Sequence, residues 1–442
     1  MDIIWRDTCS AALYEEACLA RVFNSRRPDQ HPAAIVRART ESDIIEAVQL
    51  VRNSNLQVAV RSGGHSFPAW SLRENSLLID LGDYREVEVD AERKEAWISS
   101  GMKSDIDLQL MKDHGLMLGA GHHPGVGIGG YLLQGGLSWN CRNWGWACER
   151  VRAVDVVTAD GSLVRCSAEE NRDLFWAARG AGPYFPGIAT RFLVQLLPAP
   201  MVFRSSGYIY PKNRYTEAFN WILALTPAFD KDTEIMAVCR YPDGIDETCF
   251  TVYFITMKDS VDAAWSALLP AQQTRPEGTI QEWFCREDSL EQEYANEVSA
   301  YPGDRRWVVD NAFIENEADL AAVLEQICLS LPDRRFVVLW YPLAPQSRRR
   351  LSDMAFSLQS DHYVGTYAIY ESESDDERCR SWIQDTAEKL EPFRVGSFSG
   401  EADFQARVVK CWADKDFERL NQVRQRWDPE GRFCGPLAGV DA

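Results

Sequence analysis

The sequence is poor in several features that mark particular classes of protein. It has only six histidines among 442 residues, and no two cysteines are spaced Cys-x-x-Cys. That spacing is typical of zinc ribbons and thioredoxin-like redox sites, so neither is predicted and no metal site is expected. The twelve cysteines are scattered along a chain too long to need a disulfide framework. We therefore expect them to be reduced and mostly buried.

Long apolar runs and basic runs are also missing. No stretch of 18 apolar residues occurs, so no membrane-spanning helix is predicted. The first residues, Met1–Asp7, lack the basic and then apolar pattern of a secretory signal, which favours a cytoplasmic protein. Asp and Glu number 66 against 47 Lys and Arg, for a net charge of −19. Without a basic cluster, neither nucleic acid nor an anionic membrane is expected as a partner, and no feature indicates an oligomeric state.

The chain has the composition and length of a folded protein with two domains. Hydrophobic residues make up 45% of the sequence, and 442 residues exceed the usual size of one hydrophobic core. Up to Pro198, helical and short strand patterns alternate, as in residues 40–51 and 56–60. After Pro200, apolar strands alternate with helical segments, as in 250–254 and 262–269. This order predicts an α+β fold with helices on one face of an antiparallel sheet.

Two glycine clusters carry the strongest chemical signal. Residues 61–67 read Arg-Ser-Gly-Gly-His-Ser-Phe and directly follow a predicted strand. Residues 125–130 read Gly-Val-Gly-Ile-Gly-Gly and are followed by Gly135 and Gly136. Consecutive glycines let successive backbone N–H groups point into one concavity, which suits a pyrophosphate. The clusters therefore predict a dinucleotide cofactor lying between two loops.

A Rossmann fingerprint is the obvious alternative interpretation, because Gly125, Gly127 and Gly130 satisfy Gly-x-Gly-x-x-Gly. The context does not support it. Pro124 precedes the motif where a strand should end, and the next acidic residue, Glu149, does not follow a second strand. A further alternative is that the glycines serve only in turns. Two such clusters so close together exceed ordinary turn usage, which makes this alternative less favoured.

Five motifs in order along the chain resemble those of one family. They are residues 61–71 (Arg-Ser-Gly-Gly-His-Ser-Phe-Pro-Ala-Trp-Ser), 124–130, 171–180 (Asn-Arg-Asp-Leu-Phe-Trp-Ala-Ala-Arg-Gly), 187–190 and 417–429. Together they resemble the flavin-attachment loop and signature segments of the berberine-bridge-enzyme-like flavoproteins. These belong to the vanillyl-alcohol-oxidase superfamily, whose FAD-binding domain is called PCMH-type.

The resemblance implies a PCMH-type FAD-binding domain of two α/β subdomains at residues 1–199. A substrate domain, a sheet covered by helices, is inserted at 200–399, and the chain returns to the FAD domain at 400–442. It also implies that His65 bonds covalently to the 8α carbon of the flavin. The cofactor-binding residues it implies are Arg61, Ser62, Gly63, Gly64, His65, Ser66, His123, Pro124, Val126, Gly127, Gly129, Gly130, Gly135, Gly136, Gly187 and Ile188.

The sequence departs from the family pattern in ways that affect the chemistry. Members with a doubly attached flavin have a cysteine before the proline of the second cluster, where this chain has His123. A single, histidyl attachment is therefore expected. The family often places a catalytic tyrosine where this chain has Phe398, whose ring cannot accept a proton. Val126 occupies a position where valine accompanies reaction with oxygen in this family.

A replacement base is expected on the strand predicted at residues 361–371. Alternation along a strand places Tyr363, Tyr367 and Glu371 on one face and Val364 and Ala368 on the other. Since the small apolar face suits packing against helices, the first three are predicted to face the cavity. With Val126 they are the candidate catalytic residues.

These observations predict an FAD-dependent oxidase of a small organic molecule, in secondary-metabolite biosynthesis or catabolism. Hydride transfer to the flavin and reoxidation by oxygen would yield hydrogen peroxide. An FAD-containing cyclase without net oxidation is the alternative, and a non-catalytic flavin-binding protein is a third and weaker one.

Overall fold

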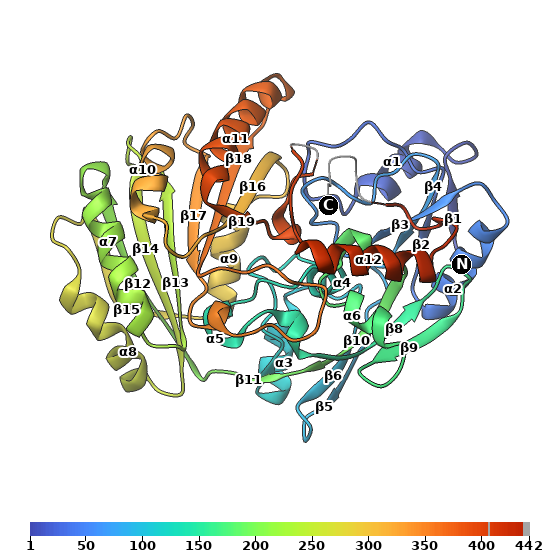
Figure 1. Ribbon diagram of the computed structural model, residues 1–442, viewed down its shortest axis with the longest axis horizontal. Coiled ribbons are helices and arrows are strands. Elements are labelled where there is room, and N and C mark those ends of the chain that lie inside the picture. Colours follow the sequence, from blue (N-terminus) through green and yellow to red (C-terminus); the bar gives the residue numbers. More distant parts are fainter. Residues whose placement is uncertain (405–406, 436–442) are drawn as a thin grey trace.

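The computed structural model describes residues 1–404 and 407–435, which form two lobes (Figure 1). The first lobe holds three small sheets built before residue 200, and the second is organised around one eight-stranded sheet. Helix α12 (Asp414–Trp427) returns to the first lobe and packs against α6 (Arg172–Ala177). The division into domains at residues 199 and 399 stays a prediction.

The first sheet of the first lobe is mostly parallel. Its strands lie in the order β1, β2, β4, β3, with β1 antiparallel to β2. Their bounds are Ile3–Trp5, Ala34–Arg37, Ser76–Asp80 and Gln57–Arg61. Helices α1 (Ala11–Leu19) and α2 (Glu41–Arg52) accompany this sheet. Helix α2 begins with a capping box between Thr40 and Asp43, as the sequence pattern predicts.

The second sheet is antiparallel, with the strand order β5, β6, β10, β8, β9. Its strands span Val87–Asp90, Glu95–Ser99, Ile188–Gln195, Val151–Val157 and Leu163–Ser167. A two-stranded sheet pairs β7 (Leu116–Met117) with β11 (Leu197–Pro198). Between strands the chain forms α3 (Ile106–His114), α4 (Ile128–Leu133) and α5 (Cys141–Trp144).

The sheet of the second lobe is antiparallel throughout its order β15, β12, β14, β13, β17, β18, β16, β19. The strands, from β12 to β19, span Val202–Pro211, Thr233–Arg240, Cys249–Lys258, Gln281–Asp288, Arg306–Ile314, Val337–Pro342, His362–Tyr370 and Arg394–Gly396. Its helices are α7 (Tyr215–Leu225), α8 (Val261–Thr274), α9 (Leu290–Ala300), α10 (Leu320–Leu329) and α11 (Asp376–Leu390).

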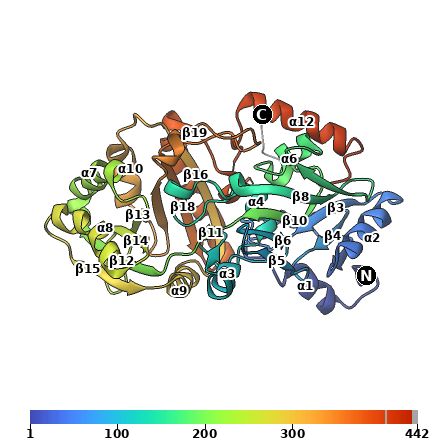
Figure 2. The same ribbon diagram turned by 90° about the horizontal axis from the view of Figure 1, so that it is seen from below.

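The two faces of this large sheet have different partners. Helices α7, α8, α10 and α11 cover the outer face, and the opposite face meets the first lobe (Figure 2). On β18, Val364 and Ala368 belong to the core under the helices, while Tyr363 and Tyr367 belong to the core between the lobes. The alternation predicted for this strand is confirmed. The expected α+β architecture, with helices on an antiparallel sheet, is confirmed as well.

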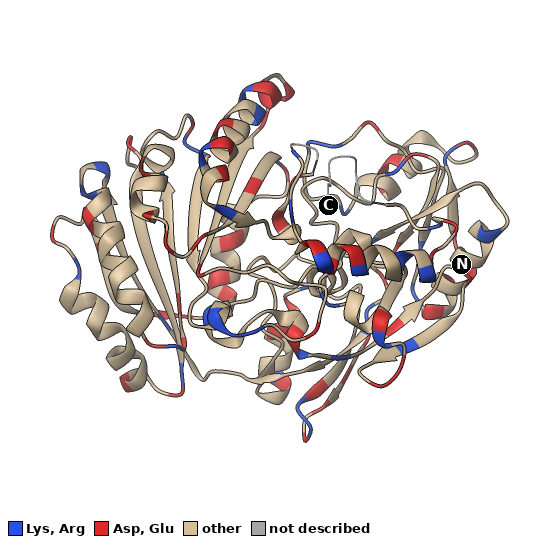
Figure 3. Cartoon of the chain, in the orientation of Figure 1, with Lys and Arg blue, Asp and Glu red and all other residues tan. Residues whose placement is uncertain are grey.

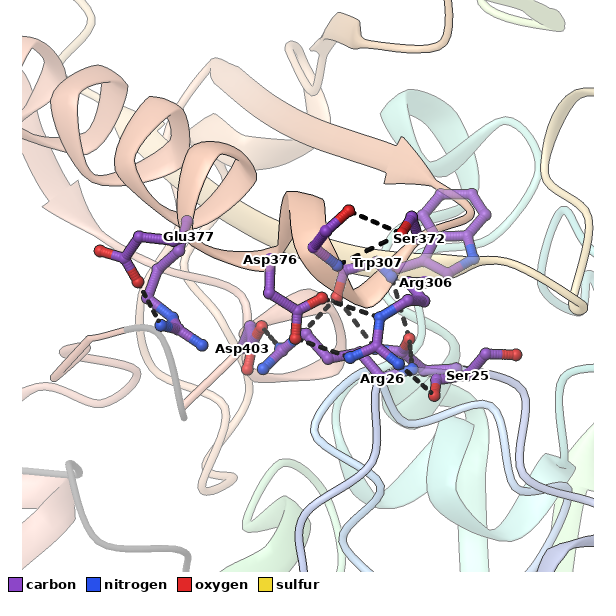
Figure 4. A network of polar contacts seen from close by, with 11 residues as sticks. Ser25, Arg26, Arg306, Trp307, Ser372, Asp376, Glu377 and Asp403 are labelled. Atoms are coloured by element: carbon purple, nitrogen blue, oxygen red, sulfur yellow. Dashed lines mark hydrogen bonds and ion pairs between the residues drawn. The ribbon is translucent and has the colours of Figure 1, made fainter.

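A polar network ties the amino-terminal segment to the second lobe and to the returning chain (Figure 4). Arg26 forms a buried ion pair with Asp403 and donates from Nε to the Trp307 carbonyl at 2.8 Å. Asn24 accepts from the Trp307 N–H at 2.9 Å and donates back to its carbonyl. These bonds fix Trp307, at the start of β16, against the first lobe.

Lys and Arg residues are dispersed over both lobes among the more numerous Asp and Glu residues (Figure 3). Within the described residues, no helix has both the length and the apolar character needed to cross a membrane. All twelve cysteines carry free thiols, and nine of them are buried, as expected for reduced cysteines in a large core.

Candidate active site

A cavity of about 350 Å³ runs through the first lobe to the inner face of the large sheet. Its first-lobe wall comes mainly from two loops, which we call loop 1 (residues 61–67) and loop 2 (residues 123–130). Its second-lobe wall is made of residues from β13, β16, β17 and β18, from α9 and the residue after it, and from residues 398–401 after β19. These are Met236, Glu297, Tyr301, Trp307, Leu339, Tyr341, Tyr367, Phe398 and Glu401.

Loops 1 and 2 are in direct backbone contact. A Cβ atom on Gly63 would lie 2.3 Å from the Gly127 nitrogen, and one on Gly127 would lie 2.1 Å from the Gly63 nitrogen. Atoms cannot approach so closely, so glycine is required at both positions. The Ser100 carbonyl bridges the two loops, because it accepts from the Ser62 hydroxyl at 2.5 Å and from the Gly129 N–H at 3.2 Å.

The glycines are therefore crowded by protein. A Cβ on Gly64, whose φ is +78°, would lie 1.8 Å from the Arg21 carbonyl oxygen, and one on Gly129 would lie 2.7 Å from the Ser100 Cβ. The protein itself fills the space where a side chain would begin at Gly63, Gly64, Gly127 and Gly129. All four also line the cavity, and their contact with the cofactor stays a prediction.

His65 lies at the junction of the loops, in contact with other rings. It stacks on Phe23 with ring centroids 4.2 Å apart and an angle of 26° between planes, and its centroid is 4.5 Å from that of His123. Burial, with smaller contributions from His123 and Lys103, holds the pKa of His65 well below its usual value. The imidazole is therefore neutral at pH 7 and keeps a nitrogen lone pair.

His123 is neutral for the same reasons. Burial and the Lys103 ammonium lower the pKa of His123 to about 4. Its Nδ1 accepts a hydrogen bond from the Gly125 N–H at 3.0 Å, which fixes the ring within loop 2. Val126, which directly follows Gly125, lines the cavity and is half-buried. Cys141, by contrast, is buried and does not line this cavity.

Tyr363 and Tyr367 converge on one carboxylate, that of Glu401. Each hydroxyl donates to Glu401 Oε2 at 2.5 Å. Burial, followed by the negative charge of Glu401, holds the pKa of both tyrosines well above the usual value, so both are protonated. Tyr367 and Glu401 line the cavity. Glu401 is 38 positions from Tyr363 and 34 from Tyr367 in the sequence, yet the three residues form one hydrogen-bonded cluster.

Glu371 does not join this cluster, and its predicted placement is wrong. It follows the last residue of β18 and is 60% exposed, paired with Arg335 at 2.6 Å and with Arg305 at 3.5 Å. Alternation gave the correct face for Tyr363 and Tyr367, but it does not extend to Glu371 because the strand ends at Tyr370. The chain then turns toward solvent and carries the carboxylate away from the cavity.

Further acidic groups line or border the cavity. His122 Nε2 forms a hydrogen bond with Glu234 Oε1 at 2.7 Å. The other oxygen of this carboxylate accepts a hydrogen bond from the Asn140 N–H. Burial alone would lower the pKa of His122, but the Glu234 carboxylate outweighs it and the pKa is raised. Burial raises the pKa of Glu297 to about 7. With Glu401, these residues were missed because they come from the position before loop 2, from β13, from α9 and from the turn at residues 399–401, and no local motif links them.

Phe398 lines the cavity. This is the position at which the family resemblance implied a catalytic tyrosine. Asn311, buried on β16, holds its backbone by accepting from the Phe398 N–H at 2.6 Å and donating to the Phe398 carbonyl at 3.0 Å. The hydroxyls of Tyr363 and Tyr367 supply polar groups that the phenylalanine lacks.

The remaining predicted cofactor residues fall into two groups. Those that line the cavity are Arg61, Ser62, Gly63, Gly64, His65, Ser66, His123, Val126, Gly127, Gly129, Gly130, Gly187 and Ile188. Pro124, Gly135 and Gly136 do not. Gly135 and Gly136, both with positive φ, pack instead against Phe356 and Tyr131 in the interior. Their inclusion among residues facing the cavity is therefore corrected.

The surroundings fit an FAD molecule. The cavity lining includes Val58 and Phe433, both glycine loops, and Tyr367 and Glu401 of the inner wall, and loop 1 carries the neutral histidine His65. Such a lining suits a cofactor with a flavin, a pyrophosphate and an adenosine in line. The described residues contain no cluster of three metal-ligating side chains.

Comparison with known proteins agrees with this geometry. A family model described as an FAD binding domain matches residues 32–167, which include both loops. The FAD-linked oxidoreductase ptmO of Penicillium ochrochloron is 38% identical over 430 residues, covering 97% of this chain and 95% of that protein. (R)-6-hydroxynicotine oxidase of Paenarthrobacter nicotinovorans is 31% identical over 234 residues, covering 52% of this chain and 49% of that protein.

Among solved structures, BBE-like #28 of Arabidopsis thaliana matches with a TM-score of 0.84 at 18% identity, covering 100% of this chain and 98% of that one. The fold is therefore the PCMH-type FAD-binding fold of its neighbours. Because of the 38% identity over nearly the whole length, the chain belongs to the family of FAD-linked oxidoreductases. The resemblance seen in the sequence and the prediction of an FAD-dependent redox enzyme are confirmed, and the cyclase alternative is not favoured.

Proposed function

We propose that this protein is an FAD-dependent oxidase acting on a small molecule whose reacting carbon bears an O–H or N–H group. The observation that carries the proposal is the Glu401 carboxylate, which accepts from Tyr363 and Tyr367 at the inner wall of the cavity. FAD held by loops 1 and 2 would supply the electron chemistry, namely hydride acceptance from the substrate and return of two electrons to oxygen as hydrogen peroxide. The relative named (R)-6-hydroxynicotine oxidase supports this choice of acceptor.

The proton that leaves the substrate needs an acceptor, and we assign this role to the Tyr367–Glu401 pair. Tyr367 reaches the cavity and remains protonated, so its hydroxyl can receive a proton as it passes its own to Glu401. Tyr363 holds the same carboxylate oxygen from the other side and fixes its position. The cluster would replace the base lost at Phe398.

We assign covalent attachment of the flavin to His65. A neutral imidazole is the form that could act as a nucleophile toward the 8α carbon, and the surroundings of His65 keep it neutral. The new N–C bond would replace a C–H bond of the 8α methyl group, whose proton would leave, and the two electrons left on the flavin would pass to oxygen. His123 stands where a second attachment would need a cysteine, so a single bond is proposed. In the same way, residues 1–199 and 400–442 would hold the cofactor, and 200–399 would bind the substrate.

Val126 is the position proposed to admit oxygen. Its small side chain lines the cavity on loop 2, next to the residues around His65. Leucine would add one methylene group to this wall and narrow the path for a diatomic gas.

The proposal is tested by following oxygen and flavin absorbance together. Flavin reduced by light under argon should reoxidise rapidly in air and release hydrogen peroxide in equal amount. Val126→Leu should slow this step and leave anaerobic reduction by substrate nearly unchanged. Product formed at full rate without oxygen, with the flavin spectrum unchanged, would overturn the proposal. A reduced flavin that ignores oxygen but reduces an artificial acceptor would restrict the enzyme to a dehydrogenase.

A further inference from the structure

The end of the cavity farthest from the large sheet is closed by the carboxyl-terminal part of the described chain. Phe433, Cys434 and Gly435 line it together with Val58 and Ala59 of β3. The sequence motifs assign no function to these three carboxyl-terminal residues. They follow α12 and lie more than 370 positions from β3 in the sequence.

This segment is held on β3 as an additional strand-like edge. The Val58 N–H donates to the Arg432 carbonyl at 2.8 Å, and the Cys434 N–H donates to the Val58 carbonyl at 2.9 Å. The buried Asp428 carboxylate accepts from the Arg432 N–H at 2.7 Å and the Phe433 N–H at 3.0 Å. Phe433 is only 3% exposed and packs in the core with Val58 and Ile188. The wall is therefore a fixed part of the fold.

Its position along the cavity identifies the part of the cofactor that it faces. Strand β3 leads directly into loop 1, so Val58 lies roughly 10 Å before Arg61 at about 3.3 Å per residue. His65 lies at the other end of loop 1, where its ring stacks on Phe23, and Phe23 in turn contacts Trp307 of the second lobe. A flavin anchored at His65 with its pyrophosphate at the two loops leaves only the adenosine for the end at Phe433.

We propose that residues 432–435 form one wall of the adenosine part of the FAD site, with Phe433 and Val58 enclosing the adenine ring. An aromatic ring and aliphatic side chains suit a flat, largely apolar base. The site would thus select FAD over FMN, because FMN lacks the adenosine part of the molecule. The proposal rests on FAD binding and on the orientation given by His65, and it does not require the histidyl bond to form.

Cys434 provides a direct probe, because it lines this end of the cavity and is partly exposed. Protein free of flavin can be made in riboflavin-starved cells and treated with iodoacetamide, and each cysteine is then quantified by mass spectrometry. AMP and FAD should protect Cys434 from alkylation, and FMN should not. Cys9 and Cys285, which are also partly exposed but do not line the cavity, should react equally in every sample. Protection by FMN, or no protection by AMP and FAD, would overturn the proposal.

A variant tests the selection between cofactors. In a His65→Ala background, where the proposed bond cannot form, Phe433→Ala should weaken FAD binding at least tenfold and leave FMN binding unchanged, as followed by flavin fluorescence. Phe417→Ala removes another buried phenylalanine near the end of the chain, outside the cavity, and should weaken both flavins alike or neither. Equal loss of FAD and FMN in Phe433→Ala would show a structural effect only and reject the adenine contact. Flavin that stays bound after acid treatment in His65→Ala would instead contradict the attachment, and the alkylation result would stand.

Discussion

The two walls of the active-site cavity are built by different means. The first lobe contributes mainly backbone, since loops 1 and 2 touch at Gly63 and Gly127, where no side chain fits. The second lobe contributes side chains, with Tyr363, Tyr367 and Glu401 drawn together from separate elements. A common cofactor requires one backbone shape, whereas a substrate requires particular side chains. The first wall is therefore expected to tolerate almost no change, and the second to change chemistry without changing the fold.

Removal of His65 should have the largest effect on the first wall. His65→Ala deletes the neutral imidazole, so flavin should be released completely when the protein is precipitated with acid, whereas the parent protein keeps one flavin per chain. Absorbance of the supernatant measures this. Cys141→Ala, a buried residue outside the cavity, serves as the control and should retain its flavin. Flavin that remains attached in His65→Ala would refute the assignment.

On the second wall, Glu401→Gln should lower the rate of anaerobic flavin reduction by about 10²–10⁴-fold, the usual contribution of a general base. The amide keeps the size of the side chain but cannot take up a proton. Stopped-flow absorbance gives the rate, and the flavin content should stay normal. Glu371→Gln, an exposed glutamate just beyond the end of β18, should leave the rate unchanged. An unimpaired Glu401→Gln enzyme would place the base elsewhere.

Two neighbouring glycines sharpen the contrast within loop 2. A Cβ on Gly129 would lie 2.7 Å from the Ser100 Cβ, and the Ser100 hydroxyl is committed to the Ala189 carbonyl. Gly129→Ala should therefore cost about 1–3 kcal/mol of folding free energy. At Gly130 the nearest atom is 3.9 Å away, so Gly130→Ala should keep or slightly raise the stability of α4. Thermal unfolding of both variants decides this, and equal melting temperatures would contradict the packing described.

The smallest effect is expected at a carboxyl pair away from the cavity. Burial, followed by its neighbour Asp288, raises the pKa of Glu293 on α9 to about 9. The unfolded chain loses this proton near pH 4.5, whereas the folded chain keeps it, so this group lowers stability progressively as pH rises from 4.5 to 9. Glu293→Gln should raise the melting temperature at pH 8 by about 1 °C, which corresponds to roughly 1 kcal/mol in a chain of 442 residues. No gain at pH 8 relative to pH 5 would show that Glu293 is ionised in the folded protein.

The predictions from sequence were more successful for the first wall, which is built from contiguous loops, than for the second, which is built from separate elements. Loop 1 and loop 2 are contiguous segments whose composition alone marks a special backbone, so their meeting could be predicted. Tyr363 and Tyr367 were found because the period of a strand is two residues. Glu371 was misplaced because alternation does not reveal where a strand ends. Glu401 was missed because it lies in a short turn, and the tyrosines that it contacts belong to β18, a strand elsewhere in the sequence.

By itself the sequence determined the class of this protein, the α+β architecture, the two glycine loops and the histidine between them. Each of these depends on residues that are close together in the chain, where local backbone preferences act directly. Only the tertiary structure decided that Glu401 meets two tyrosines of β18, that Glu297 and the His122–Glu234 pair border the same cavity, and that Phe433 closes its far end. These contacts join segments up to hundreds of residues apart. Burial in the assembled fold, which no local pattern encodes, sets their proton affinities and brings them together.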